Sequence, residues 1–377
     1  MSDRGRASRC GGTTGRLAAS LWLAAALGCG AGGPKSGVSL TTETWPAAGN
    51  PAGQCAVPAG AGLEDTSHPT TVVGSGTPES CTPAALLAAI HDAGVVTFDC
   101  GPAPVTITLA SPIEIVNDSG VNKDGDTVID GGGKVTLSGG GATRILYQNG
   151  CDESLHWITS HCQDYDHPRL VVQNLTFADG YAPAPVPTLG FSAGGAIYAE
   201  SGLLKIVNCV FVRNAVSPIG PDVAGAAVYS FMQAGPVYVV NSTFGGAPGL
   251  GNVGSNGGAL GSIGVSYTVL NSVMTYNQAI GWGENPATNG PGGGSGGAIY
   301  NDGDTYTLTI CGSDVSNNSA KELGGAVFYV SDDNSGSVAI EQSTFAANAC
   351  QAPQNPKGFY VQTNPANVSI DATNHIE

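Results

Sequence analysis

The sequence predicts an all-β solenoid, a parallel β-helix in which a single chain winds through stacked coils. Three observations predict it: a short glycine phrase recurs, apolar residues recur at fixed positions around it, and the apolar runs are too short for repeated helices. Repetition is considered first because it decides the architecture of the whole chain. The phrase, a glycine followed by Gly or Ala, then Ala and an aliphatic residue, begins at Gly194, Gly225, Gly257, Gly296 and Gly324.

Each phrase is followed by a large apolar anchor residue, with apolar residues five and seven places before it. This spacing is the alternation of a strand, and the runs are β-branched and broken by Gly, Asn and Ser, unlike the long runs of helix formers that helical repeats need. A coil of short strands cannot pair its own backbone groups, so each coil must pair with its neighbours at roughly 4.8 Å. The anchors are Phe211, Phe244, Met274, Val315 and Phe345. When the coils are aligned on the anchor position, the residues five places before it are Val172, Ile206, Val239, Val269, Ile310 and Ile340, and the residues seven places before it are Leu170, Leu204, Val237, Tyr267, Leu308 and Val338.

Polar residues also recur in register. The position three places before the anchor is mostly Asn, which suits a tight turn whose side-chain amides bond to the next coil. A second Asn follows most anchors by three places and is missing after Phe244. The first set is Asn174, Asn208, Asn241, Asn271, Gly312 and Gln342, and the second is Asn214, Asn277, Asn318 and Asn348.

The pairing of Gly-Gly-Ala-Ile with Phe-x-x-Asn resembles the bacterial polymorphic outer-membrane proteins and, more broadly, the right-handed parallel β-helices of the pectin-lyase-like superfamily. The resemblance covers about Val95 to Asn348. It implies a single-stranded, right-handed solenoid. It says little about activity, because that fold hosts lyases, hydrolases, adhesins and inert stalks.

Composition restricts the partners. Charged residues make up only 11% of the chain and Gly supplies 57 of 377 residues, as turns and stacked ladders require. The formal net charge of −16 repels nucleic acid and leaves no polybasic surface for it. Anionic polysaccharides such as pectate would also be repelled unless a basic groove or a bound cation intervened.

Residues 1–28 have the pattern of an export signal, with four Arg before an apolar run that is too short to span a membrane. Gly28-Cys29 resembles the lipobox of bacterial lipoproteins, so Cys29 is the expected lipid attachment residue; plain secretion is the alternative. Residues 29–80, rich in Pro, Gly, Ala, Ser and Thr, predict a flexible tether, in which Cys55 has no explanation. We therefore expect an exported monomer at the bacterial outer membrane or cell surface, touching the membrane only through its lipid.

Residues 81–94 predict one α-helix, which we expect to cap the open end of the solenoid formed by residues 95–377. Thr82 suits the N-cap, Pro83 the first helical position and Gly94 the exit. The apolar residues Leu86, Leu87 and Ile90 are predicted to share one face of this helix. Cys81 and Cys100 bracket the helix and the first strand, and a disulfide between them is expected in an exported protein.

An insertion at 150–167 departs from the repeat and gathers His, carboxylates and two cysteines. Asp164, Asp166 and His167 are candidate ligand contacts, and a disulfide between Cys151 and Cys162 would close the loop. A structural loop, a ligand-contact loop and a metal site all remain open, although we expect no metal. Residues 122–126 superficially suggest calcium, but they lack the glycine and glutamate of a calcium loop, so no cofactor is expected.

A second insertion at 281–295 accounts for the longest interval between glycine phrases. Its Trp282 could stack on a sugar ring, or fold back over apolar coils. Cys209 stands where sibling coils have Ser, which predicts a buried small residue, and Cys311 and Cys350 could not be paired from the sequence.

Catalysis is uncertain, and the sequence favours its absence. A polysaccharide lyase needs a strong base and cations at the uronate, and basic residues are sparse here. Of the motifs that polygalacturonases share, only Asp332-Asp333 is present. The leading hypothesis is a non-catalytic, adhesin-like or glycan-contacting surface module, and the alternative is a polysaccharide lyase or glycoside hydrolase.

Overall fold

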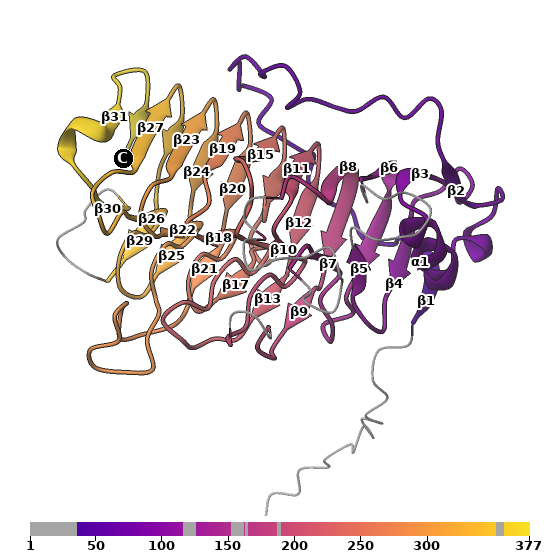
Figure 1. Ribbon diagram of the computed structural model, residues 1–377, viewed down its shortest axis with the longest axis horizontal. Coiled ribbons are helices and arrows are strands. Elements are labelled where there is room, and N and C mark those ends of the chain that lie inside the picture. The colour runs from indigo at the N-terminus through magenta and orange to yellow at the C-terminus, as the bar shows by residue number, and fades with distance from the viewer. Residues whose placement is uncertain (1–35, 116–125, 152–161, 163–164, 187–189, 352–357) are drawn as a thin grey trace, which may run out of the picture. The chain divides into compact units, whose positions relative to one another are not determined.

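A computed structural model of the chain describes residues 36–115, 126–151, 162, 165–186, 190–351 and 358–377. Within these residues the protein is all-β and most strands are parallel, stacked coil on coil as in a parallel β-helix (Figure 1). The export signal, Cys29, Asp164 and most of the 150–167 insertion lie outside the described residues. None of the described helices is long and apolar enough to cross a membrane.

The strands form three sheets, and nearly all neighbours within each sheet come from successive coils. Among the strands of the described residues, only β1 pairs antiparallel, with β4. Sheet A contains β1 (Gly37–Leu40), β2 (Thr71–Gly74), β3 (Gly94–Asp99), β4 (Val105–Thr108), β6 (Thr127–Ser138), β8 (Arg169–Ala178), β11 (Leu203–Val207), β12 (Val210–Val212), β15 (Val237–Val240), β16 (Thr243–Phe244), β19 (Tyr267–Leu270), β20 (Val273–Thr275), β23 (Thr307–Cys311), β24 (Asp314–Ser316), β27 (Ser337–Glu341), β28 (Thr344–Phe345), β31 (Val368–Ile370) and β32 (His375–Ile376).

The other two sheets complete each coil. Sheet B contains β5 (Ile113–Ile115), β7 (Leu146–Asn149), β10 (Ile197–Glu200), β14 (Val228–Phe231), β18 (Leu260–Ile263), β22 (Ile299–Asp302), β26 (Val327–Val330) and β30 (Phe359–Gln362). Sheet C contains β9 (Tyr181–Ala182), β13 (Ala215–Val216), β17 (Val253–Gly254), β21 (Gln278–Ala279), β25 (Ser319–Ala320) and β29 (Ala349–Cys350).

The predicted apolar ladders are interior columns. Ile206 pairs with Val239, Val239 with Val269, and the column continues through Ile310 to Ile340, all fully buried. The anchors stack in the same way, with the rings of Phe177 and Phe211 4.8 Å apart and those of Phe211 and Phe244 4.6 Å apart. Residues of like shape therefore lie over one another along the stack.

A buried ladder of asparagines runs beside the anchors. In each rung the side-chain oxygen of one Asn accepts the backbone N–H of the Asn one coil earlier, as from Asn252 to Asn277 at 3.1 Å and from Asn277 to Asn318 at 2.9 Å. The rung missing after Phe244 is filled by Asn252, because the glycine-rich segment 245–251 loops out before the chain returns to register. Asn214 donates its backbone N–H to Asn252 at 3.0 Å, so the ladder is continuous there.

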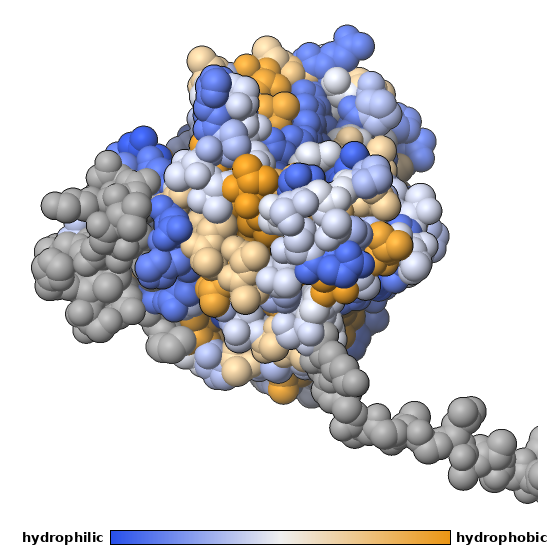
Figure 2. All heavy atoms as spheres, turned by 90° about the vertical axis from the view of Figure 1, so that its right-hand side faces the viewer, coloured by the Kyte–Doolittle hydropathy of each residue, from blue (hydrophilic) through white to orange (hydrophobic). Residues whose placement is uncertain are grey.

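The helix α1 (Pro83–His91) packs against β2, β3 and β5, and a short 3-10 helix, η1 (Pro78–Ser80), precedes it; a second, η3 (Pro365–Asn367), precedes β31. Thr82 caps α1 through Ala85 N–H at 3.1 Å. Leu86, Ala89 and Ile90 are buried, whereas Leu87 is 51% exposed, so its assignment to the buried face was wrong. Viewed from the α1 end, hydrophobic side chains form separate patches among hydrophilic ones (Figure 2).

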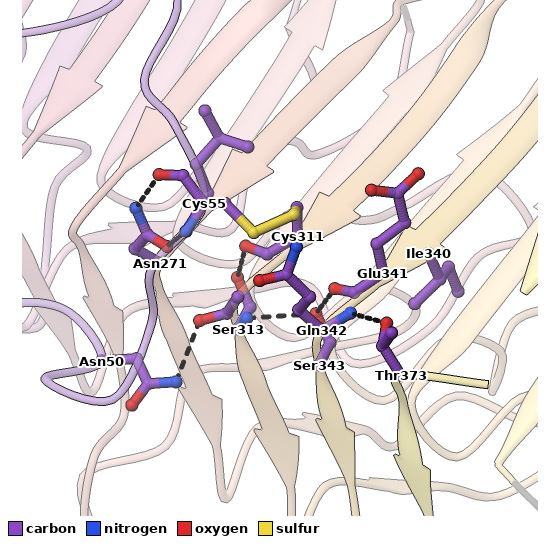
Figure 3. The surroundings of a disulfide bond; sticks show 12 residues. Asn50, Cys55, Asn271, Cys311, Ser313, Ile340, Glu341, Gln342, Ser343 and Thr373 are labelled. Atoms are coloured by element: carbon purple, nitrogen blue, oxygen red, sulfur yellow. Dashed lines mark hydrogen bonds between the residues drawn. A yellow bond between two sulfur atoms is a disulfide. The ribbon is translucent and has the colours of Figure 1, made fainter. Parts of the chain in front are cut away.

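Three disulfides cross-link the described chain. Cys81 pairs with Cys100 and Cys151 with Cys162, as the sequence predicts. The third joins Cys55 to Cys311, 256 residues apart (Figure 3). Cys209 is fully buried, as expected, and burial raises the pKa of its thiol to about 12.

The segment predicted to be a tether lies instead against sheet A from residue 36 onward. Residues 41–66, here called the strap, leave β1, reach Cys311 on β23 and return to β2 along the face opposite the interior columns (Figure 1). Along the way Gly49 donates its N–H to Thr243 Oγ1 at 3.0 Å, and Thr66 donates to Asp130 Oδ2 at 2.8 Å. The composition of this segment does not allow it to form a hydrophobic core of its own. It packs instead on apolar side chains of sheet A, where Ala61 contacts the outward-facing Val207, Val240 and Leu270.

Candidate functional site

The outer face of sheet B carries a row of aromatic side chains at one register position. Tyr300 stacks on Phe328 with ring centroids 5.0 Å apart, and Phe328 on Tyr360 at 5.1 Å. Gly261 interrupts the row beside Tyr300, because it occupies the same register position without a side chain. The row comprises Tyr147, Tyr198, Tyr229, Tyr300, Phe328 and Tyr360.

A pocket of about 220 Å³ opens beside this row, under the 281–295 insertion. We call it the acidic pocket, because two aspartates contribute to its wall and none of its lining residues is basic. Phe328 and Tyr360 also line this space, but Phe328 is only 2% exposed because its ring is stacked between Tyr300 and Tyr360, so Tyr360 is the more accessible ring. The lining residues are Asn285, Pro286, Asp302, Phe328, Val330, Asp332, Tyr360 and Gln362.

Asn285 joins the insertion to the sheet. Its Nδ2 lies 3.0 Å from Asp222 Oδ1 and 3.1 Å from Asp302 Oδ2, and 2.5 Å from the Tyr300 hydroxyl. Because Asp222 Oδ1 and Asp302 Oδ2 both contact Asn285 Nδ2, these two carboxylate oxygens lie close to each other. One amide thus bridges two carboxylates that come from separate loops and strands.

The electrostatics of the acidic pocket favour protonation. Burial raises the pKa of Asp302 to about 6, with the charges of Asp332 and Asp222 adding to the effect and a hydrogen bond from Tyr300 opposing it. Burial also raises the pKa of Asp222. With a pKa of about 6, Asp302 holds its proton to a higher pH than an ordinary aspartate, and a raised pKa of this kind is what a carboxyl needs to act as a general acid.

The hydroxyl of Tyr229 is fully buried and has no hydrogen-bond partner among the described residues. Burial raises its pKa well above the ordinary value, with the charges of Asp222 and Asp302 contributing. It is a neutral donor held in the field of both carboxylates.

Trp282 lies on the same insertion, 47% exposed, but does not line the acidic pocket. The neighbouring Gly283 N–H donates to Glu322 Oε1 at 3.0 Å, which fixes the base of the loop. About half of the Trp282 side chain is therefore exposed, and its ring lies close to Gly290 of the same insertion.

The other predicted contacts lie elsewhere. Asp166 and His167 precede β8 in sheet A, where His167 Nδ1 is 2.9 Å from Asp126 Oδ1 and Arg169 is 3.0 Å from Asp166 Oδ2. The hydrogen bond from Arg169 lowers the pKa of Asp166. These groups satisfy one another as a surface ion-pair network, and among the described residues no set of His, Cys, Asp and Glu is arranged to hold a metal ion.

Three basic side chains of the repeat region pair with carboxylates, whereas Arg144 donates to the carbonyls of Ala193 and Gly194. Arg169 pairs with Asp166, Lys205 with Glu64, and Arg213 with both Asp179 and Glu43 at 2.7 Å. Arg213 also lies 5.0 Å above the ring of Trp45. Arg169, Lys205 and Arg213 are thus held in ion pairs within the fold.

Sequence reasoning found Asp332 and missed Asp222, Asn285 and Asp302. A signal for Asp302 was present, because it stands three places after the aliphatic residue that ends the glycine phrase, where Glu200 is its counterpart in the first copy and apolar residues follow in the other three. Asp222 and Asn285 carried no such signal, since they lie on irregular loops. Comparisons with protein families, with curated proteins and with solved structures find no match for this chain.

Proposed function

We propose that this protein is an exported surface module that contacts neutral glycans through the acidic pocket, without catalysis. The scaffold would be a right-handed parallel β-helix of the pectin-lyase type, with α1 capping its first coil. The observation that carries the proposal is the meeting of carboxylate and carboxamide side chains with the half-buried ring of Tyr360 in one pocket. Sugars offer hydroxyls to the former and C–H faces to the latter, and a few convergent polar groups fix their orientation.

The charge of the pocket selects among glycans. Uronates would meet Asp302 and Asp332 with no basic residue in the lining, so like charges would oppose binding. Neutral hexoses incur no such penalty. The small volume suits one sugar unit at the end or edge of a chain.

A second candidate is glycoside hydrolysis. It is favoured by the raised pKa of Asp302, about 6, in a pocket that holds a second carboxyl, Asp332, because such enzymes pair a protonated with an ionised carboxyl. Lyase chemistry has less support, since it needs cations that the pocket lacks.

Asp302→Asn is expected to weaken binding of neutral oligosaccharides about tenfold at pH 7.5, because a sugar hydroxyl would then donate to a neutral amide oxygen instead of a charged carboxylate. Wild-type affinity should fall as the pH drops through about 6, because Asp302 then gains a proton, and the variant should lose this dependence. Isothermal titration against a panel of neutral and uronate oligosaccharides measures both, with Asp304→Asn, two residues away and exposed, as the matched control. Equal binding by wild type and Asp302→Asn would refute contact through this pocket, and release of reducing ends that Asp302→Asn abolishes would establish hydrolysis instead.

Export and lipid attachment at Cys29 complete the proposal. They are supported by the basic and apolar pattern of residues 1–28 and by three disulfides, which persist in oxidising compartments. Cells expressing the full chain and fed a labelled fatty acid should incorporate label into wild type and not into Cys29→Ser, which should leave the detergent phase on partitioning. Cys209→Ser is the matched control, and label retained by Cys29→Ser would disprove attachment there.

A further inference from the structure

The strap encloses a groove on the outer face of sheet A, far in sequence from the acidic pocket. Two adjoining cavities of about 400 and 550 Å³ lie between its outward arm, residues 41–53, and the turns of sheet A. They share Ala48, Gly133, Asn174 and Asn208, so they form one continuous space. We call this space the amide trench.

The floor of the amide trench is the row of asparagines that the sequence placed three residues before the anchors. Asn174, Asn208 and Asn241 line it and have positive φ values of 54°, 53° and 46°, so they occupy equivalent turns of three successive coils. Asn208 Nδ2 donates to Asn174 Oδ1 at 3.2 Å, and Asn174 Nδ2 donates to Asp130 Oδ1 at 3.0 Å. Each of these amides keeps a second N–H and a second lone pair for a further partner. The Asn241 side-chain amide makes no hydrogen bond to the described part of the chain, although it faces the groove.

The same row shows what such an amide can hold. Asn271, the next member, accepts the N–H of Cys55 at 2.9 Å and donates to its carbonyl at 2.9 Å, so it clasps one strap peptide from both sides (Figure 3). Gln173, beside the row, clasps Glu64 in the same way at 2.9 and 3.1 Å. Asn208 and Asn241 lie between these clasps; Gly49 of the strap packs on the Asn241 backbone, but no described strap residue is hydrogen-bonded to either side-chain amide.

The spacing of the row discriminates between ligands. Neighbouring coils are about 4.8 Å apart, whereas an extended peptide advances about 3.3 Å per residue, so successive amides cannot clasp successive peptide groups. The strap accordingly uses one clasp on each arm. A pyranose unit in an extended glycan chain spans close to the coil spacing and offers a pair of hydroxyls that can meet an amide N–H and C=O together.

We propose that the amide trench is a second binding site, which takes a linear neutral oligosaccharide lying along the stack with consecutive units on Asn241, Asn208 and Asn174. The cavity that contains all three amides has no charged residue in its lining; the adjoining cavity has one residue of each sign, Glu43 and Lys134, and neither cavity favours a ligand of one charge. The wall of the amide trench is fixed before binding by the Gly49–Thr243 hydrogen bond and the Cys55–Cys311 disulfide, so little ordering cost remains. The site is independent of the acidic pocket.

The test is the dependence of affinity on chain length. Neutral β-1,4-linked glucose, mannose and xylose oligomers, from disaccharide to hexasaccharide, are titrated into the full chain. Wild-type affinity should rise for at least one series until the ligand covers three amides. The Asn208→Gly/Asn241→Gly variant should lose that rise, about tenfold at the longest oligomer for two lost amide contacts. Glycine keeps the left-handed turn available, as Gly312 does in the same row with φ of 63°.

Two controls isolate the amides. Gln342→Gly makes the same backbone change at another member of the row, with φ of 50°, outside the trench lining, and should bind as wild type does. Asp302→Asn should retain the chain-length dependence, which separates this site from the acidic pocket. If the double glycine variant unfolds, Asn241→Asp keeps the turn while replacing the N–H donor, and the same loss is expected. No chain-length dependence in any series, or an unchanged profile in the double variant, would overturn the proposal.

Discussion

A Cys55→Ser/Cys311→Ser variant is expected to lose about 5 kcal/mol of unfolding free energy, because chain-entropy stabilisation grows with the length of the closed loop. That loop is the longest of the three, with a sequence separation of 256 against 19 for Cys81–Cys100. The strap would also lose the covalent end of its outward arm. Guanidinium unfolding of the oxidised protein, followed by circular dichroism, measures the change.

The matched control is Cys81→Ser/Cys100→Ser, whose shorter loop predicts a loss of about 3 kcal/mol. A difference of about 2 kcal/mol between the two variants is the diagnostic result, because side-chain removal is the same in both. Equal losses would show that loop length does not govern the effect, and that the strap is held by its hydrogen bonds alone.

Asn277→Ala is the substitution with the next largest expected effect, a loss of about 3 kcal/mol. The Asn277 side chain accepts the backbone N–H and Nδ2 of Asn252 and donates to the Phe244 carbonyl at 3.0 Å. All of these groups are buried, and a buried polar group left without its partner costs about 1–3 kcal/mol. Chemical denaturation of the pure variant gives the value.

Asn348→Ala tests whether burial is the cause. Asn348 occupies the same register and accepts from Asn318 N–H at 3.0 Å, but it is only half-buried, so water can replace the lost bonds. We expect a loss of about 1 kcal/mol there. A loss as large as that of Asn277→Ala would mean that the ladder acts through backbone geometry rather than through unsatisfied groups.

The fold could be predicted because the stack repeats its contacts. Once Ile206 and Val239 are aligned, every later coil adds independent support for the same column, and the turn amides keep the register. The sequence did not reveal that Asn252 belongs to the asparagine ladder. A glycine-rich loop before it moves the asparagine further along the chain from its anchor, although the asparagine still bonds to the same neighbouring coils. A constant number of residues between anchor and asparagine can therefore be read from the sequence only where no loop is inserted between them.

The strap and the acidic pocket were beyond the sequence for a different reason. The low-complexity composition of the strap indicates that it cannot form a hydrophobic core by itself. The contacts of Ala61 and Cys55 show that it can nevertheless pack on the outer face of sheet A. The contact between Asp222 and Asn285 joins two loops 63 residues apart. Neither loop repeats, so no register relates them before the coils are stacked.

The bond between Cys55 and Cys311 also changes how the molecule would carry a load. Stacked coils interact mainly with their nearest neighbours, so a chain pulled from both ends would ordinarily unwind one coil after another. Here the two cysteines are 256 residues apart in sequence, and the disulfide bypasses the chain between them, so tension entering near residue 36 passes through Cys55 directly to β23. Only the chain before Cys55 and the coils beyond β23 can lengthen while that bond is intact.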